Sequence, residues 1–295
     1  NFLWLDREDG LYHFDKTLGT ASPIKFSPQA QNAIKGERAY SYYVVDNDHI
    51  FFLNSHGYYS YSINSKEITP LTALDNEINP ISIHGFQGFK GQLPGFPDSV
   101  LLTTTGRLYL YNYKHNTVTK IYEVKEYSEE AIDYIDSWLI DRDNTLWLAV
   151  SGEGLIGLDA TTFTEKHRID ITSGLKTTDV YSLEIDGSNN LWMSSQHGIY
   201  QINLQGLDVQ HYDANDGLIS DEFNGSASGR RADGTLIYGT QLGLVQFDPK
   251  VFLASSFNHQ QNFPIALSDI EVLSSGRKFA DLANQNNQLE LAHDE

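Results

Sequence analysis

Carboxylates are the most abundant side chains in this sequence that could carry out chemistry. Close pairs recur along the chain, at Glu129/Glu130, Asp133/Asp136 and Asp221/Glu222. A glycosidase needs two carboxyl groups that face one another across a sugar, and sequence spacing does not supply that distance. The ten histidines are scattered, without the HExxH spacing of a metal site. The sequence therefore predicts no catalytic site, although a glycosidase or lyase remains an alternative.

Other segments resemble reactive or metal-binding motifs only in part. The aspartate-rich turns 6–10 and 141–144 lack the twelve-residue pattern and closing glutamate of a calcium loop. Residues of this kind usually bond to their own backbone in turns. The run GSASG at 225–229 is not the GxSxG elbow of hydrolases, and no phosphate-binding glycine motif occurs. We therefore predict no metal and no cofactor.

The elements that would position these side chains are short strands. Residues 179–203 contain three apolar or alternating runs, at 180–185, 191–194 and 199–202, separated by Gly, Ser, Asn and Gln. Such spacing is typical of an antiparallel meander. The second run of each copy is marked by a large residue, and these recur 45–50 positions apart: Trp4, Phe51, Leu101, Trp147, Trp192 and Ile237. A glycine follows each at nearly the same period: Gly10, Gly57, Gly106, Gly154, Gly198 and Gly243.

Four strands per unit at this period predict the blades of a β-propeller. The first unit begins at its second strand, and the sixth has no clear fourth strand. The ring therefore has either six blades closed by remote segments or seven blades, one of which precedes this chain. The glycine-rich segment 84–98 is expected to be a surface loop pinned by phenylalanines, or alternatively a docking loop.

The change of composition after Pro249 divides the chain. We predict a β-propeller over residues 1–254, a polar linker over 255–263, and the beginning of a truncated β-sandwich domain over 264–295. The fold class is thus all-β.

Loops at one face of a propeller are the expected place for a ligand. The turns between second and third strands hold His56, Glu153, Gln196, His197 and Gln241. Arg230 and Arg231 form a paired cation in the last unit, which could meet an anion or an acidic residue of this chain. Trp147 and Trp192 could stack on a sugar, but their fixed place in the second strand predicts core packing instead.

The composition limits the partners. The chain has 20 Lys and Arg against 39 Asp and Glu, a formal net charge of −19, which disfavours nucleic acid and anionic membrane surfaces. It has no cysteine, which fits the periplasm, and no run of eighteen apolar residues that could span a membrane. We expect it to be a fragment of something longer.

Residues 175–203 resemble the repeat of the two-component regulator propeller family, with an apolar strand, an Asp-Gly turn, Leu-Trp, and a glycine before an aromatic strand. Residues 136–159 match the same repeat, and residues 217–249 are similar to the terminal blade of these sensors. Residues 264–295 then look like the start of the immunoglobulin-like domain that follows the propeller in that family. The resemblance weakens in the second and third units, where Phe51 and Leu101 replace the tryptophan.

This resemblance implies the periplasmic sensor region of an inner-membrane receptor. In the family, a cytoplasmic histidine kinase or diguanylate cyclase receives the signal, the receptor dimerises, and the known ligands are largely oligosaccharides. On this basis the chain is a ligand-sensing domain rather than an enzyme, attached to the membrane only through segments outside this sequence. A scaffold that binds only protein remains the second alternative.

Overall fold

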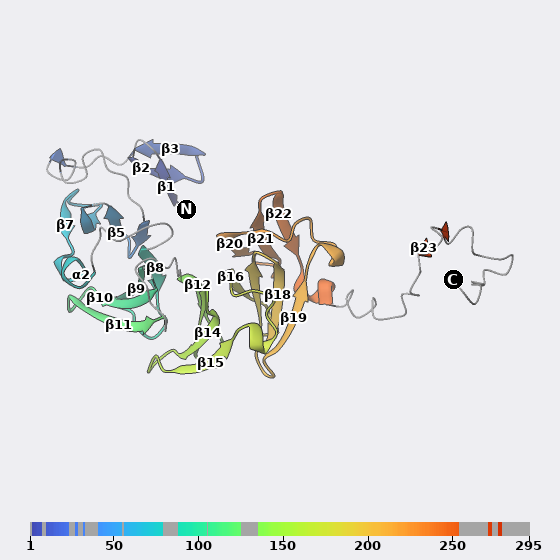
Figure 1. Cartoon of the computed structure of the whole chain (residues 1–295). Coiled ribbons are helices and arrows are strands. Elements are labelled where there is room, and N and C mark those ends of the chain that lie inside the picture. Colours follow the sequence, from blue (N-terminus) through green and yellow to red (C-terminus); the bar gives the residue numbers. More distant parts are fainter. Residues whose placement is uncertain are drawn as a thin grey trace. The chain divides into compact units, whose positions relative to one another are not determined.

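The computed structural model describes residues 2–7, 10–23, 27–28, 32, 41–54, 56–78, 88–104, 106–124, 135–253, 271–272 and 277–278. The chain divides into two compact units, Asn1–Asp248 and Pro249–Glu295. The first unit is built almost entirely from β-strands (Figure 1). Within the described part of the chain, no helix has both the length and the apolar character needed to cross a membrane.

Six antiparallel sheets follow one another along the first unit, and each is a meander whose strands pair in chain order. The first has three strands: β1 (Phe2–Arg7), β2 (Gly10–Asp15) and β3 (Thr20–Pro23). The second has four: β4 (Ser41–Val44), β5 (His49–Asn54), β6 (Gly57–Ser62) and β7 (Ile68–Pro70), followed by the helix α2 (Thr72–Glu77). The third has four: β8 (Gly88–Gln92), β9 (Ser99–Thr104), β10 (Arg107–Asn112) and β11 (Thr117–Glu123).

The last three sheets continue the same order. The fourth comprises β12 (Ile135–Ile140), β13 (Thr145–Val150), β14 (Gly154–Asp159) and β15 (Glu165–Ile169). The fifth comprises β16 (Val180–Ile185), β17 (Asn190–Ser195), β18 (Gly198–Asn203) and β19 (Asp208–Tyr212). The sixth has β20 (Phe223–Arg230), β21 (Leu236–Thr240) and β22 (Gly243–Phe247). Two short 3-10 helices, η2 (Ile171–Ser173) and η3 (Ala214–Asp216), lead into the fifth and sixth sheets.

These sheets confirm the predicted all-β propeller of blade-like units. Each large residue that marked a repeat lies in the strand expected of it, from β1 to β21. The glycine that follows it opens the next strand, or in the case of Gly106 directly precedes it, and Gly198, the first residue of β18, has a φ of +96°. A Cβ there would lie 2.1 Å from the carbonyl oxygen of Tyr212. The turn therefore requires glycine both for its left-handed backbone and for the close approach of β19.

The hydrophobic core lies between neighbouring blades. One cluster joins residues of the third and fourth sheets, including Leu101 and Leu148, and another joins the fourth and fifth, including Trp147 and Met193. Alternating side chains of each strand face opposite sides of the sheet, so one blade contributes to two clusters. Trp147 and Trp192 are 1% and 0% exposed, which confirms that both tryptophans are core residues.

The glycine-rich segment 84–98 contains a strand that the sequence analysis missed. Residues 88–92 form β8, the first strand of the third sheet, so the prediction of a surface loop was wrong for this part. Its glycines allow close contact with neighbouring sheets, since a Cβ at Gly91 would lie 3.2 Å from Cζ2 of Trp138. Residues 84–87 lie outside the described part.

The two ends of the propeller differ from the complete blades. The first sheet gains β3 but begins, as predicted, with the strand equivalent to the second of other blades. The sixth sheet ends at β22 within the described residues, and residues 249–253 are helical. In the second unit, the described residues beyond this helical turn are β23 (Glu271–Val272) and β24 (Arg277–Lys278), which form one antiparallel pair. The predicted linker over 255–263 and most of the sandwich over 264–295 lie outside the described residues.

Candidate functional site

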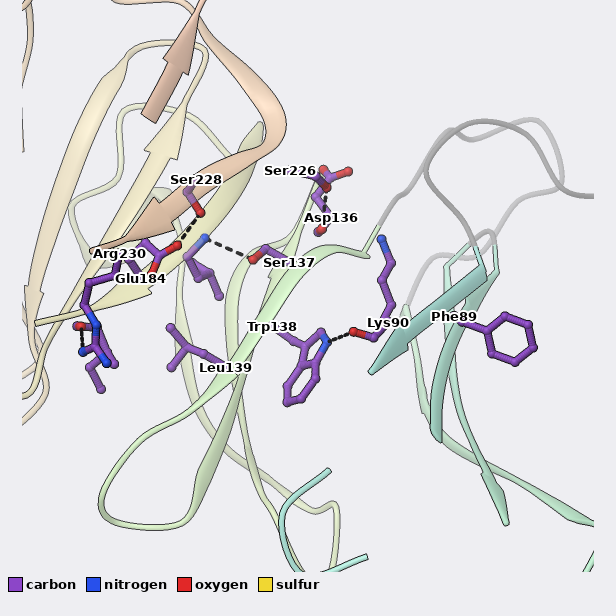
Figure 2. A pocket seen from close by; sticks show the side chains of 12 residues that line it. Phe89, Lys90, Asp136, Ser137, Trp138, Leu139, Glu184, Ser226, Ser228 and Arg230 are labelled. Carbon is purple, nitrogen blue, oxygen red and sulfur yellow. Dashed lines mark hydrogen bonds between the residues drawn. The ribbon is translucent and has the colours of Figure 1, made fainter. Parts of the chain in front are cut away.

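The first strands of four blades wall a cavity of about 640 Å³ in the first unit (Figure 2). The strands are β8, β12, β16 and β20, which begin 43–47 residues apart in the sequence but come together in space. Charged and polar side chains line the cavity from all four strands. They are Lys90, Asp136, Ser137, Trp138, Glu184, Ser226, Ser228 and Arg230. Such a concave surface with converging polar groups is the usual form of a small-molecule site.

Irregular pairing is shared by the four strands that wall the cavity. Each of the four shifts register against the second strand of its own sheet, for example between Ile135 and Ser137 in β12 and between Val180 and Leu183 in β16. By contrast, β4, which contributes no lining residue, pairs with β5 in continuous register. A bulge bends its strand and turns side chains away from the regular alternation. In β20 the irregular stretch contains Ser226, which adopts a left-handed φ of +52°.

Short hydroxyl side chains fasten these strands to one another. Ser137 Oγ accepts a hydrogen bond from the backbone N–H of Leu183 at 3.1 Å, and Ser226 Oγ donates to the carbonyl oxygen of Asp136 at 2.9 Å. Ser182 Oγ accepts from the backbone N–H of Ala227 at 3.0 Å. Backbone groups of the irregular strands thus find partners in other blades. The cavity wall is therefore a bonded framework made from three separate repeats.

Longer side chains complete the wall. Arg230 donates from Nη1 to the carbonyl oxygen of Ile185 at 2.7 Å, and Ser228 donates to Glu184 Oε1 at 2.8 Å. Trp138 donates from Nε1 to the carbonyl oxygen of Lys90 at 3.3 Å, which fixes the indole between β12 and β8. Figure 2 shows the contact of Trp138 with Lys90 on one side, and those of Arg230 and Ser228 on the other. The indole supplies an apolar surface beside charged groups.

Burial perturbs the ionisable groups of the cavity. It raises the pKa of Asp136 to about 6, against an opposing effect of the Lys90 ammonium. Burial also raises the pKa of Glu184, while the hydrogen bond from Ser228 and the charge of Arg230 act in the other direction. Burial lowers the pKa of Lys90, and Asp136 opposes that shift. Shifts of this kind collect at binding and catalytic sites as well as in structural ion pairs.

The aspartate-rich turn 6–10 lies partly outside the described residues, whereas turn 141–144 and its equivalent 186–190 have a structural role. Asp141 Oδ1 accepts the backbone N–H groups of Asp143 and Thr145 at 2.9 and 2.8 Å, and its Oδ2 accepts Nε1–H of Trp147 at 2.8 Å. Asp186 holds Trp192 in the same way at 3.0 Å. Within the described residues, no three His, Asp or Glu side chains come together as a metal site would require. The carboxylates of these turns therefore orient the core tryptophans.

The structure places the predicted binding residues in several separate places. His56, Glu153, Gln196, His197 and Gln241 lie in the turns between second and third strands, as expected, and all but Glu153 are exposed. Glu153 is bonded to Arg168 Nη1 at 2.5 Å and to Tyr122 at 3.0 Å. None of these turn residues lines the cavity. Their part in binding stays a prediction.

The two arginines differ from one another. Arg230 lines the cavity at the end of β20. Arg231 is exposed in the turn that follows, where its backbone N–H donates to Thr235 at 2.9 Å, as that of Asp186 does to Asn190 at 3.0 Å. Arg231 thus occupies the position that Asp141 and Asp186 have in the fourth and fifth blades. In this sixth blade, Ile237 replaces the tryptophan to which those aspartates are bonded. The structure does not bring the pair together as one anion site.

Sequence reasoning missed most of the cavity residues. Asp136 was considered only as one of many carboxylates, and Lys90 lies in a segment predicted to be a loop. A usable signal was present in IDSWLI (135–140) and VYSLEI (180–185), where a single carboxylate interrupts an otherwise apolar and hydroxyl-bearing first strand. A charge in an inner strand indicates a side chain that faces a solvated channel rather than the core.

Comparison with known proteins identifies similar chains. No family model matches. The histidine kinase P4 of Formosa agariphila is 33% identical over 106 residues, which are 36% of this chain and 7% of that protein. The extracellular domain of the hybrid two-component system BT3049 of Bacteroides thetaiotaomicron has a TM-score of 0.69 at 17% identity, over 99% of this chain and 37% of that chain.

A second extracellular domain from that bacterium, of BT4673, has a TM-score of 0.52 at 15% identity, over 83% of this chain and 36% of that chain. These solved structures share the propeller fold. The chain spans little more than a third of their length and a small part of the kinase. Together the similarities confirm the resemblance to the two-component regulator propeller family.

Proposed function

We propose that this chain, which resembles the two-component regulator propeller sensors in sequence and in fold, is the extracytoplasmic ligand-sensing region of a membrane-bound signalling receptor. The periplasm is its proposed location, and a small molecule or oligosaccharide is its proposed ligand. The similarity to a histidine kinase and to extracellular domains of two-component systems supports this role. In the whole receptor a cytoplasmic kinase or diguanylate cyclase would receive the signal, and the receptor would act as a dimer.

The cavity is the observation that carries this proposal. Its wall comes from four blades, so a ligand that fills it contacts β8, β12, β16 and β20 at once. A ligand transmits a signal only if it binds one arrangement of the protein better than another. A molecule that touches four blades together favours the arrangement in which all four contacts are made. The hydrogen bonds between inner strands provide the path by which such a preference spreads through the propeller.

A thermal-shift screen of this chain tests the proposal. Neutral oligosaccharides, amino acids and divalent cations are compared at fixed protein concentration, and each is then analysed by chromatography for turnover. A ligand that binds only the folded protein raises the melting temperature in a saturable way. We expect a saturable shift with one class and no product. Absence of any shift across these classes would contradict the proposed ligand.

A glycosidase or lyase is the second candidate, because the cavity contains two carboxyl groups. Asp136 and Glu184 both line it, and both have a raised pKa, as a general acid requires. Chromatography in the same screen separates the two functions. Product formation that is lost in both Asp136→Asn and Glu184→Gln would identify an enzyme, whereas binding without product supports the sensor.

A further inference from the structure

One buried carboxylate in the cavity lacks the partners that comparable groups have. Asp136 is 7% exposed, and no described residue donates a hydrogen bond to its side chain. Two other aspartates among the described residues are equally buried, Asp141 at 8% and Asp186 at 5%. Asp141 accepts three hydrogen bonds from described residues, and Asp186 accepts four. Asp136 therefore differs from the other two buried aspartates in lacking hydrogen-bond donors among the described residues, although all three are buried to a similar extent.

An ionised carboxylate without donors is unfavourable inside a protein. Removal from water destabilises the charge, and ordinary folds compensate with hydrogen bonds or an opposite charge. Lys90 on β8 supplies an opposite charge near Asp136, but it does not offset the burial, since the pKa of Asp136 remains raised. The charge of Asp136 also contributes to the raised pKa of Tyr181 in β16. Glu184 and Arg230 line the same cavity. The fold thus retains the Asp136 carboxylate as a hydrogen-bond acceptor, although its ionisation lowers the free energy of unfolding.

Three donors that line the cavity are engaged with groups other than the Asp136 side chain. Ser226 donates to the backbone carbonyl of Asp136 rather than to its side chain, and Trp138 donates to the carbonyl oxygen of Lys90. Ser228 donates to one oxygen of Glu184. These bonds leave the oxygens of the Asp136 side chain without a hydrogen bond from the described residues, in a cavity that Lys90 and Arg230 also line. Such a surface fits a molecule that brings donors.

We infer that Asp136 is a ligand-binding residue, whose carboxylate accepts hydrogen bonds from a hydroxyl or ammonium group of a small molecule in the cavity. The inference rests on the proposed ligand-sensing function and adds the binding residue and the donor character of the ligand. Bonds from hydroxyl or ammonium donors to a carboxylate are among the stronger hydrogen bonds in proteins. The charge of a bound anion would be repelled by the carboxylates of Asp136 and Glu184, and although Lys90 and Arg230 also line the cavity, this assignment favours a neutral or cationic ligand.

The ligand-free protein provides the first test. Asp136→Asn keeps the shape of the side chain and removes its charge, and Asp141→Asn is the matched control at equal burial with a complete set of donors. At pH 8 we expect Asp136→Asn to melt roughly 2–6 °C above the wild type and Asp141→Asn to melt below it, by the usual relation between stability and melting temperature. A melting temperature of Asp136→Asn below that of the wild type would overturn the inference, because it would make Asp136 a structural residue.

Calorimetric titration at pH 8 provides the second test. The probes are xylotriose and laminaritriose as hydroxyl donors, putrescine as an ammonium donor, and glucuronate as an anion. We expect one donor class to bind the wild type and to bind Asp136→Asn at least tenfold more weakly. Equal affinity for both proteins, or preferential binding of glucuronate, would overturn the assignment. If no probe binds, the proposed ligand classes fail, while the melting temperature of Asp136→Asn still decides the role of Asp136.

Discussion

Asp186 holds the core tryptophan of the fifth blade, and its replacement tests how the blades are stabilised. Its Oδ2 accepts Nε1–H of Trp192 and the side-chain amide of Asn190, each at 3.0 Å. Its Oδ1 accepts the backbone N–H groups of Ser188 at 2.7 Å and of Asn190 at 2.9 Å. Trp192 is fully buried, so water does not reach its indole nitrogen. Asp186→Asn keeps the shape but turns an acceptor into a donor.

The size of the effect follows from these contacts. Asn190 can rotate its amide to accommodate the new NH₂ group, so the loss centres on the indole N–H of Trp192. An unsatisfied buried donor costs about 1–3 kcal/mol, and hydrogen bonds to charged groups contribute about 1.5–3 kcal/mol. We therefore expect Asp186→Asn to lower the free energy of unfolding by roughly 2–4 kcal/mol. In a Trp192→Phe background, where no indole donor remains, we expect about 1–3 kcal/mol of this effect to disappear.

Urea unfolding of the four proteins of this double-mutant cycle measures the coupling. Asp233→Asn is the control, because Asp233 is an exposed turn residue whose Oδ1 accepts a single bond, from Thr235 N–H at 3.0 Å, in a blade without the tryptophan. We expect only a small change of the unfolding midpoint in this control. A coupling energy within about 0.5 kcal/mol of zero would refute the reasoning, since that is the range of independent sites.

Three further predictions concern single positions. Gly198→Ala should destabilise the protein strongly, because the new Cβ would lie 2.1 Å from a carbonyl oxygen and φ is +96°. Gly187→Ala is the control, since no atom lies within 4 Å of its new Cβ, and it should leave the urea unfolding midpoint nearly unchanged. Equal shifts of the midpoint in the two variants would contradict this prediction. Glu153→Gln should lower the free energy of unfolding by roughly 1–2 kcal/mol, since the partly buried guanidinium of Arg168 loses a charged partner. An unchanged midpoint in urea would refute a stabilising role of this ion pair. Because burial raises the pKa of Asp136 from 3.8 to about 6, its ionisation destabilises the fold by about 3 kcal/mol at pH 8 and by roughly half as much at pH 5. The difference in free energy of unfolding between Asp136→Asn and the wild type should therefore narrow as the pH falls through 6 toward 3.8. A difference that is constant with pH in urea unfolding would contradict the raised pKa.

The blade architecture could be predicted because its signals are local. Alternation of side chains along a strand and the glycine or asparagine of a turn act within about five residues. Their repetition at 45–50 residues then indicates a propeller. The same locality explains the error at Gly88–Gln92. Glycines in a strand usually indicate a loop, but here they permit the close approach of Trp138, which belongs to the next blade.

The candidate site was predicted only in part, because its residues are separated along the chain. The turns that hold His56, Gln196 and Gln241 were found where expected, since hairpin turns are local. The cavity was not predicted, because Lys90, Asp136 and Glu184 come from three different blades. Sequence spacing gives no information about which side of an irregular strand each one faces.

The sequence by itself determined the repeating strands, their turns, the place of the tryptophans in the core and the strongly acidic character of the chain. Each of these depends on the type of a residue and on its near neighbours. Only the tertiary structure decided that four inner strands come together, that their bulges turn polar side chains toward one cavity, and that Asp136 lacks the donors given to Asp141 and Asp186. Hydrogen-bond satisfaction depends on groups that are far apart in the sequence, as in the bond from Ser226 to the carbonyl of Asp136, 90 residues away, so it is a property of the folded chain alone.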